Sequence, residues 1–136
     1  MKAKLTVLWA VLLTVACAGV GVAQNTGASP SKAKRVDVEA FDKLRANTNV
    51  VLLDVRSAAE FEKGRIPGAI NIDINSAQFA DKAGALDKSK TYLVNCAVGM
   101  RSARACKKLE GMGFTNLIDL APGFDGWKKA GKPVVK

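Results

Sequence analysis

The stretch Thr91–Met112, TYLVNCAVGMRSARACKKLEGM, decides the fold because it holds a strand signal and a helix signal almost back to back. Its start, Thr91–Asn95, is a short run rich in apolar and β-prone residues, which is typical of a buried strand. Its end, Arg101–Met112, repeats apolar residues at helical spacing and stops before Gly113, a residue type that commonly ends helices. A strand followed closely by a helix is the unit from which parallel sheets are built.

The same alternation extends outward in both directions along the chain. The expected strands are Arg35-Val36, Val50–Val55, Ala69–Ile72, Thr91–Asn95 and Thr115–Leu120. The expected helices are Val38–Ala46, a short helix started by the capping box Ser57-Ala58-Ala59-Glu60, one from Asn75 or Ser76 to about Lys82, Arg101–Met112 and Phe124–Ala130. This order predicts an α/β fold with a central, mostly parallel sheet of about five strands and helices on both faces.

The start of the chain, residues 1–23, is predicted to be a secretory signal peptide. Met1–Lys4 carries two lysines, and Leu5–Ala18 is apolar apart from two threonines. Gly21-Val22-Ala23 then supplies the small residues that signal peptidases prefer, with cleavage after Ala23. The protein is therefore expected to be exported, most simply to a periplasm.

Two other interpretations of the N-terminus stay open. Leu5–Ala23 is just long enough to be a retained membrane anchor. Cys17 follows an alanine, as a lipidated cysteine does in a lipoprotein signal. In each case residues 24–34, rich in Ser, Gly, Ala, Asn and Lys, are expected to be a flexible leader, and residues 35–136 to form the domain.

The chain is basic, with 21 Lys and Arg against 12 Asp and Glu and a formal net charge of +9 over its 136 residues. The basic residues are scattered and are not interleaved with aromatic residues, so the pattern does not favour nucleic-acid binding. A cationic surface favours small anionic substrates, although a merely solvated basic surface is the more common explanation.

Cys96 lies at the point where the central strand ends and the next helix begins. In parallel sheets, functional sites form at the carboxyl ends of strands. The helix N-terminus offers unpaired N–H groups with partial positive charge, Gly99 frees the loop backbone, and Arg101 adds a fixed cation. Together these features favour a thiolate over a thiol and could hold an anion beside it.

The protein has no histidine, which removes the usual zinc-ligand sets and any Cys-His protease mechanism. No metal or cofactor is therefore expected. Cys106 lies inside the predicted helix, more than one turn beyond the loop that holds Cys96, which is too far for a disulfide. We expect two free thiols, with Cys106 packed in the core and Cys96 activated by its loop rather than by a base.

Three segments give the chain a specific resemblance to single-domain rhodaneses. They are LLDVRSAAEFEKGRIPGAINI (Leu52–Ile72), CAVGMRS (Cys96–Ser102) and PGFDGWKKAGKPV (Pro122–Val134). They occur in the order and at the spacing of that family, and the resemblance extends from about Val36 to Val134. It implies the rhodanese-like α/β fold and a sulfurtransferase activity.

The resemblance also implies roles for individual residues. Cys96 would be the nucleophile that carries a sulfane sulfur as a persulfide. The loop that would bind the substrate consists of Ala97, Val98, Gly99, Met100 and Arg101. Asp54 and Arg56 match the family's D-x-R. Asp54, with Ser102, would support the site, while Arg56 would contact the substrate or act as a structural ion-pair partner.

The length of the loop separates sulfur transfer from phosphoryl chemistry. Related phosphatases have one more residue between the cysteine and the arginine, and here Ser102 occupies the position of that arginine. The sequence therefore resembles the sulfur-transfer class more than a phosphatase or an arsenate reductase. Ala97, Val98 and Met100 make the loop unusually apolar, and Arg65 stands where many relatives have histidine, so the identity of the donor stays open between thiosulfate and a persulfide.

The leading hypothesis is an exported, monomeric sulfurtransferase that moves sulfur from a small anionic donor to cyanide or a thiol. The alternative is a rhodanese-like sulfur-carrier or protein-binding module with little turnover of its own. In that case the partners would include a protein thiol, as donor or acceptor. Contact with a membrane is expected only if the N-terminus is retained or lipidated.

Overall fold

The computed structural model describes residues 31–136 and contains a five-stranded sheet, so the predicted signal peptide lies outside the described residues. The strands are β1 (Lys34–Val36), β2 (Val50–Asp54), β3 (Ile70–Asn71), β4 (Thr91–Asn95) and β5 (Leu117–Leu120). They lie in the order β1-β5-β4-β2-β3, and every pairing is parallel. The prediction of an α/β fold with a mostly parallel sheet is confirmed, and within the sheet all strands are parallel.

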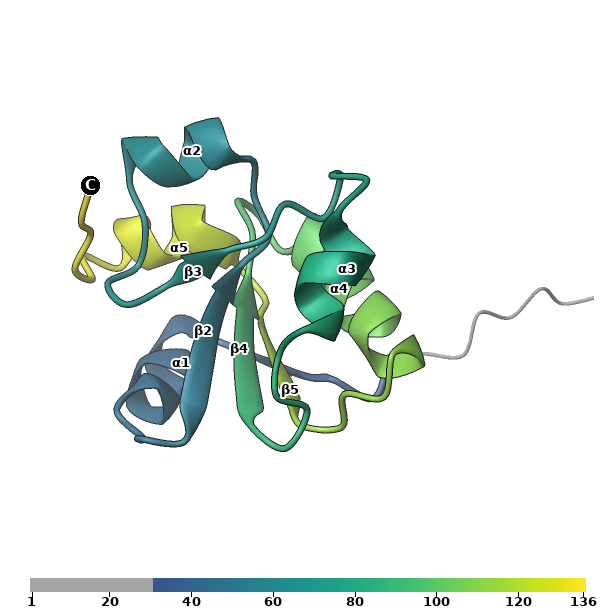
Figure 1. Cartoon of the computed structure of the whole chain (residues 1–136). Helices are drawn as coiled ribbons and strands as arrows, with labels where there is room; N and C mark the ends of the chain where they lie inside the picture. Colours follow the sequence, from purple (N-terminus) through teal and green to yellow (C-terminus); the bar gives the residue numbers. More distant parts are fainter. Residues whose placement is uncertain (1–30) are drawn as a thin grey trace, which may run out of the picture.

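The helices cover both faces of the sheet (Figure 1). They are α1 (Val38–Arg45), α2 (Ala58–Lys63), α3 (Phe79–Gly84), α4 (Met100–Gly111) and α5 (Gly123–Lys129). On one face α3 and α4 pack on the sheet, and on the other α1 and α5 do so. The two faces correspond to two separate hydrophobic cores.

Alternation along the strands separates the two cores. Leu53 and Val94 point into the core under α3 and α4, whereas Leu52 and Leu93 point into the core under α1 and α5. Strands buried on both faces need an unbroken apolar run, which explains the sequence VVLLD of β2. Trp127 of α5 is fully buried in the second core.

Side-chain caps explain where α1 and α2 begin. The Asp37 carboxylate accepts a hydrogen bond from the Ala40 N–H at 2.8 Å and starts α1. Ser57 and Glu60 form the predicted capping box of α2. The predicted boundaries of these two helices are therefore close to the observed ones.

Helix α3 begins later than predicted. The sequence indicated a cap at Asn75 or Ser76, but the helix starts at Phe79. The Asn75 N–H instead donates to the carboxylate of Asp73 at 2.8 Å, and the Gln78 N–H donates to the Ser76 Oγ at 3.1 Å. These bonds use the polar side chains to form turns ahead of the helix.

The register of the sheet brings the D-x-R motif, Asp54–Arg56, and the cysteine loop, Cys96–Ser102, to the same edge. Asp54 at the end of β2 pairs with Asn95 at the end of β4. Cys96 and Arg56, which follow these strand ends, therefore emerge at the same edge of the sheet, and α2 lies beyond that edge (Figure 1). Among residues 31–136 no helix is both long and apolar enough to span a bilayer.

Candidate active site

The site is built on the loop between β4 and α4, which wraps around the sulfur of Cys96. Cys96 is fully buried, and the Gly99 N–H donates to its Sγ at 3.1 Å. The thiol lies 3.5 Å from the Ser102 Oγ, within hydrogen-bonding distance for sulfur. Gly99 has a φ of 90°, a left-handed conformation that glycine adopts without strain and that turns its N–H toward the sulfur.

The loop amides can face the sulfur because the loop carbonyls are bound elsewhere. The Phe124 N–H donates to the Cys96 carbonyl at 2.7 Å, and the Asp125 N–H donates to the Ala97 carbonyl at 3.0 Å. These donors are the free N–H groups of the first turn of α5. The β5–α5 connection therefore fixes the direction of the peptide groups around Cys96.

Two glycines allow this close approach. A Cβ atom on Gly123 would overlap the carbonyl oxygen of Ala97, and one on Gly99 would overlap the carbonyl oxygen of Ala121. Gly123 also has a positive φ of 66°. Gly123, the first glycine of PGFDGW, is thus required by the active loop, a role that the sequence motif alone did not reveal.

The loop lowers the pKa of the Cys96 thiol below its ordinary value. Burial alone would raise this pKa, because it penalises the thiolate. Hydrogen bonds from the Ser102 side chain and amide, and from the amides of Val98 and Gly99, outweigh the burial and stabilise the thiolate. The site therefore favours a nucleophilic sulfur without a histidine.

Arg101 is bound to a carboxylate in this structure. Its two terminal nitrogens donate to the two carboxylate oxygens of Glu60, each at 2.8 Å. Glu60 is held in turn by Ser57 at the start of α2. The guanidinium that the sequence assigned to the substrate thus links the active loop to α2, a partner that motif comparison did not identify.

Arg56 is almost fully buried and is also paired. Its Nε and Nη2 donate to the Asp54 carboxylate at 2.7 to 3.0 Å, and Nη2 donates to the Gly64 carbonyl at 2.7 Å. The guanidinium lies 4.1 Å from the centre of the Phe124 ring. Of the two roles that the sequence left open, this geometry is that of an ion-pair partner, although Arg56 also lines the pocket described below.

Comparison with known proteins identifies the family. A family model described as "Rhodanese-like domain" matches residues 37–130. The chain belongs to the rhodanese-like domain family. The resemblance seen in the three sequence segments is thereby confirmed.

Similar proteins support this assignment. YtwF of Bacillus subtilis (strain 168) is 35% identical over 92 residues, which are 68% of this chain and 86% of YtwF. The thiosulfate sulfurtransferase GlpE of Pseudomonas savastanoi pv. phaseolicola is 35% identical over 96 residues, 70% of this chain and 87% of GlpE. The crystal structure of a rhodanese-related protein from Thermoplasma volcanium superposes with a TM-score of 0.65 at 32% identity, covering 75% of this chain and 97% of that one.

The apolar members of the rhodanese-like loop lie at its outer side. Val98 is 57% exposed and Met100 is 78% exposed, whereas Gly99 between them is buried. Ala97 is partly buried and lines a pocket. The loop therefore presents backbone amides to the sulfur and apolar side chains to the surroundings.

Arg35 is a site residue that the sequence did not reveal. Its guanidinium donates to the carbonyls of Gly99 at 3.4 Å and Ala121 at 3.3 Å. It also forms an ion pair with the buried Asp119 at 3.1 Å, although without hydrogen-bond geometry. Burial raises the pKa of Asp119, and the lowering effects of the Ser102 hydroxyl and of Arg35 do not offset it. Arg35 thus ties the active loop to β1 and β5.

Cys106 is separate from this chemistry. It is fully buried in α4, and both described cysteines are free, as predicted. Burial raises the pKa of the Cys106 thiol well above its ordinary value. No cluster of metal-ligating side chains occurs within residues 31–136.

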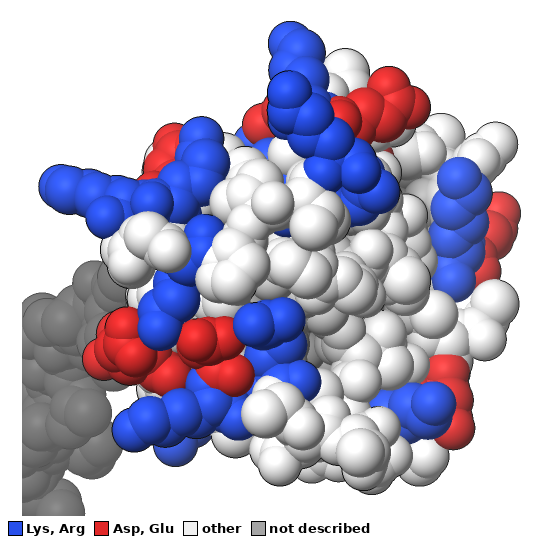
Figure 2. Space-filling view, turned by 90° about the vertical axis from the view of Figure 1, so that its left-hand side faces the viewer, with Lys and Arg blue, Asp and Glu red and all other residues white. Residues whose placement is uncertain are grey.

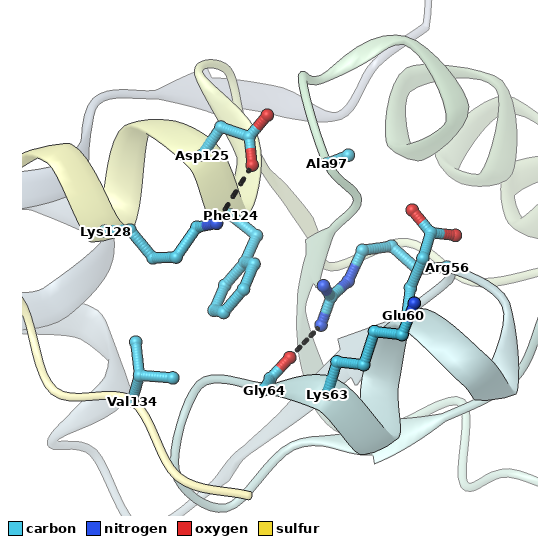
Figure 3. Close-up of a pocket in the computed structure, with 9 residues that line it drawn as sticks. All are labelled: Arg56, Glu60, Lys63, Gly64, Ala97, Phe124, Asp125, Lys128 and Val134. Carbon is cyan, nitrogen blue, oxygen red and sulfur yellow. Dashed lines mark hydrogen bonds and ion pairs between the residues drawn. The ribbon is translucent and has the colours of Figure 1, made fainter.

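A pocket of about 280 Å³ adjoins the active loop, with Ala97, Arg56 and Phe124 among its lining residues (Figure 3). Charged side chains from α2 and α5 surround it, including Lys63 and Lys128 (Figure 3). On the face that Figure 2 shows, basic side chains are separated by uncharged surface and interleaved with acidic ones. That face carries no continuous basic stripe.

Proposed function

We propose that this protein is a sulfurtransferase that carries sulfane sulfur as a persulfide on Cys96. The observation that carries the proposal is the Cys96 sulfur itself, buried, 3.1 Å from the Gly99 N–H and held with a lowered pKa. Membership of the rhodanese-like family and similarity to proteins named sulfurtransferase support it. The similarity to thiosulfate sulfurtransferases makes thiosulfate and organic persulfides the donor classes to test.

The reaction takes place in two displacement steps. In the first, the Cys96 thiolate attacks the outer sulfur of the donor, a new S–S bond forms, and the donor's S–S bond breaks to release sulfite or a thiolate. In the second, the acceptor attacks the outer sulfur of the Cys96 persulfide and leaves with it, regenerating the Cys96 thiolate. Cyanide would give thiocyanate, and a thiolate would give a new persulfide, so no external oxidant or reductant is needed.

The loop supplies the electrostatic contribution to both steps. The amides of Val98, Gly99 and Ser102 surround the position where the negative charge lies before and after transfer, and the Ser102 hydroxyl donates to the thiolate. Arg101, paired with Glu60, ties the loop to α2 and keeps it in place. The Asp54–Arg56 pair holds the neighbouring loop in place, and Arg56 forms part of the wall of the adjoining pocket.

The compartment and partners are part of the proposal. The basic start, apolar core and small residues before Gln24 favour export, with a periplasm as the destination. The substrates would be a small anionic sulfur donor and a thiol or cyanide acceptor. A protein thiol is a further partner class.

A turnover assay tests the enzymatic claim. The protein, cleaved after Ala23, is incubated with thiosulfate or an organic persulfide and with cyanide, and thiocyanate is measured over time. Turnover that Cys96→Ser abolishes and Cys106→Ser preserves is the expected result. Equal rates for the Cys96→Ser variant and the unmodified protein would overturn the proposal.

The exposed apolar side chains of the loop favour a second candidate, a sulfur carrier that docks on another protein. Val98 and Met100 are among the most exposed large apolar residues within the described part of the chain. A carrier would take one sulfur on Cys96 and pass it only to a protein acceptor. Fast multiple turnover with small donors and acceptors alone would exclude this candidate.

A further inference from the structure

The pocket beside the active loop is larger than a single inorganic donor requires. Its volume of about 280 Å³ lies just below the range of roughly 300–1,000 Å³ found for pockets that bury drug-sized ligands. Ala97 lines it, and Phe124, whose N–H binds the Cys96 carbonyl, forms part of its wall. The pocket is therefore continuous with the loop that holds the reactive sulfur and has room for the organic part of a sulfur donor.

The walls of the pocket combine apolar surface with charged side chains of both signs, because Glu60 and Asp125 line it together with Arg56, Lys63 and Lys128. The Phe124 ring and Val134 supply the apolar part. Lys63 of α2 and Lys128 of α5 come from opposite sides, with the Phe124 ring between them (Figure 3). Basic side chains outnumber acidic ones in this lining by three to two, so the pocket suits a molecule with a short hydrocarbon frame and anionic groups at its ends.

The arginines around the loop are already engaged. Arg101 forms a bidentate pair with Glu60, and Arg56 forms a bidentate pair with Asp54. A carboxylate bound in this way neutralises the guanidinium and occupies the paired N–H donors that would otherwise bind an oxyanion. A small dianionic donor such as thiosulfate would have to compete with the Glu60 and Asp54 carboxylates for these guanidinium groups.

The lysines of the pocket are less constrained. Lys128 is 52% exposed and lies 3.5 Å from an Asp125 carboxylate oxygen, which is a weak surface ion pair. Its Nζ lies 5.0 Å from the centre of the Phe124 ring, at the edge of the pocket. Lys63 is exposed at the end of α2. Both ammonium groups can turn toward a ligand at little cost in existing contacts.

We infer that this pocket binds the organic part of a low-molecular-weight persulfide that bears carboxylates, with Lys63 and Lys128 as specificity-determining residues. This inference rests on the proposed sulfur transfer and names its donor class. In the reaction, the Cys96 thiolate forms an S–S bond with the outer sulfur of R–S–SH. The S–S bond of the donor breaks, the RS⁻ thiolate leaves into the pocket, and the proton stays on the outer sulfur now attached to Cys96. The R group binds in the pocket while its carboxylates face the two lysines.

The test compares two persulfide donors of similar size, one made from mercaptosuccinate and one from uncharged thioglycerol, with thiosulfate as a third donor. Sulfur transfer to Cys96 is followed by rapid quench and intact mass, and kcat/KM is obtained for each donor. The test variant is the double substitution Lys63→Gln and Lys128→Gln. The matched control is Lys43→Gln with Lys90→Gln, which changes the net charge equally at exposed positions outside the pocket lining.

The inference predicts that the test variant loses roughly fivefold to tenfold in kcat/KM for the mercaptosuccinate persulfide, because two partly exposed charge contacts are removed. Transfer from the thioglycerol persulfide should change less than about twofold, and the control variant should resemble the unmodified protein. Equal losses on the charged and uncharged persulfides, or no loss on either, would overturn the inference and leave the sulfurtransferase proposal intact. No transfer from any of the three donors to the unmodified protein would overturn both.

Discussion

At the scale of single residues, the account depends on how the loop stabilises the Cys96 thiolate. Because hydrogen bonds from the loop and Ser102 outweigh burial, the thiolate should form below the ordinary thiol pKa of about 8.5. The rate of alkylation of Cys96 by iodoacetamide should therefore rise with pH around a midpoint below that value. Peptide mapping would follow Cys96 and Cys106 separately, and Cys106, whose pKa burial raises, should stay unmodified in the folded protein.

Removing one of these hydrogen bonds gives the matched comparison. Ser102→Ala deletes the side-chain donor and leaves the Gly99 amide in place. The alkylation midpoint should move to higher pH, because a hydrogen bond to the charged form of the sulfur is lost. An unchanged midpoint would show that the backbone amides alone set the pKa.

Glu60 provides a pH-dependent prediction for stability. Hydrogen bonding by Arg101 lowers the pKa of Glu60 to about 2, against the opposing effect of burial. Because the folded-state pKa is depressed, the stabilisation is fully present above the unfolded-state value of about 4.3 and is lost as the pH falls through the folded value. The side chains are partly exposed, so Glu60→Gln should cost about 0.5–1 kcal/mol in the free energy of unfolding at pH 7.

Urea unfolding at several pH values would measure this contribution. The difference between the unmodified protein and Glu60→Gln should shrink as the pH falls from about 4.5 toward 2. Glu62→Gln, on the same helix and exposed, is the control and should change stability little at any pH. A difference for Glu60→Gln that stays constant through this range would contradict the assigned ion pair.

At the scale of elements, the junction of β5 and α5 is predicted to control the active loop. Gly123→Ala places a Cβ against the Ala97 carbonyl at a positive φ, so it should cost roughly 2–4 kcal/mol in the free energy of unfolding. Gly131→Ala is the control, because Gly131 has a φ of 73° but open space around its Cβ position. It should cost about 1 kcal/mol, from backbone strain alone. Urea denaturation of both variants would show whether Gly123→Ala costs more free energy of unfolding than Gly131→Ala. Equal costs would contradict the close contact between Gly123 and the Ala97 carbonyl.

Most elements could be predicted from local sequence, because local signals dominate where a strand is buried on both faces or a cap is present. The apolar run of β2, the strand β4 and the caps Asp37 and Ser57 are examples. The start of α3 could not, because the side chains of Asp73 and Ser76 are equally suited to a turn. The sequence also did not reveal contacts between distant segments, such as Glu60 with Arg101 or Arg35 with the Gly99 carbonyl.

At the scale of the whole molecule, the N-terminus predicts where the protein works. If residues 1–23 are a cleaved signal, the protein isolated from its host should begin at Gln24. N-terminal sequencing or intact mass would report this. A protein that still carries Met1–Lys4 would support the retained anchor, and one that begins at a lipid-modified Cys17 would support the lipoprotein signal.

Several elements together position the Cys96 sulfur at the carboxyl ends of the strands. Cys96 follows the end of β4, and Arg56 follows the neighbouring end of β2. Amides in the first turn of α5 bind the carbonyls of the loop. The two cores support the sheet from opposite faces, and the hydrogen bonds from α5 to the Cys96 and Ala97 carbonyls set the direction of the loop amides. Catalysis by such a loop requires neither a metal nor a histidine.

The most direct test of the central claim is the mass of the protein after exposure to a sulfane donor, with the modified residue located by peptide mapping. The account predicts an increase of one sulfur atom, located on Cys96, lost on treatment with cyanide, and absent in Cys96→Ser but present in Cys106→Ser. No added sulfur from either thiosulfate or a persulfide, or an added sulfur that persists in Cys96→Ser, would contradict it.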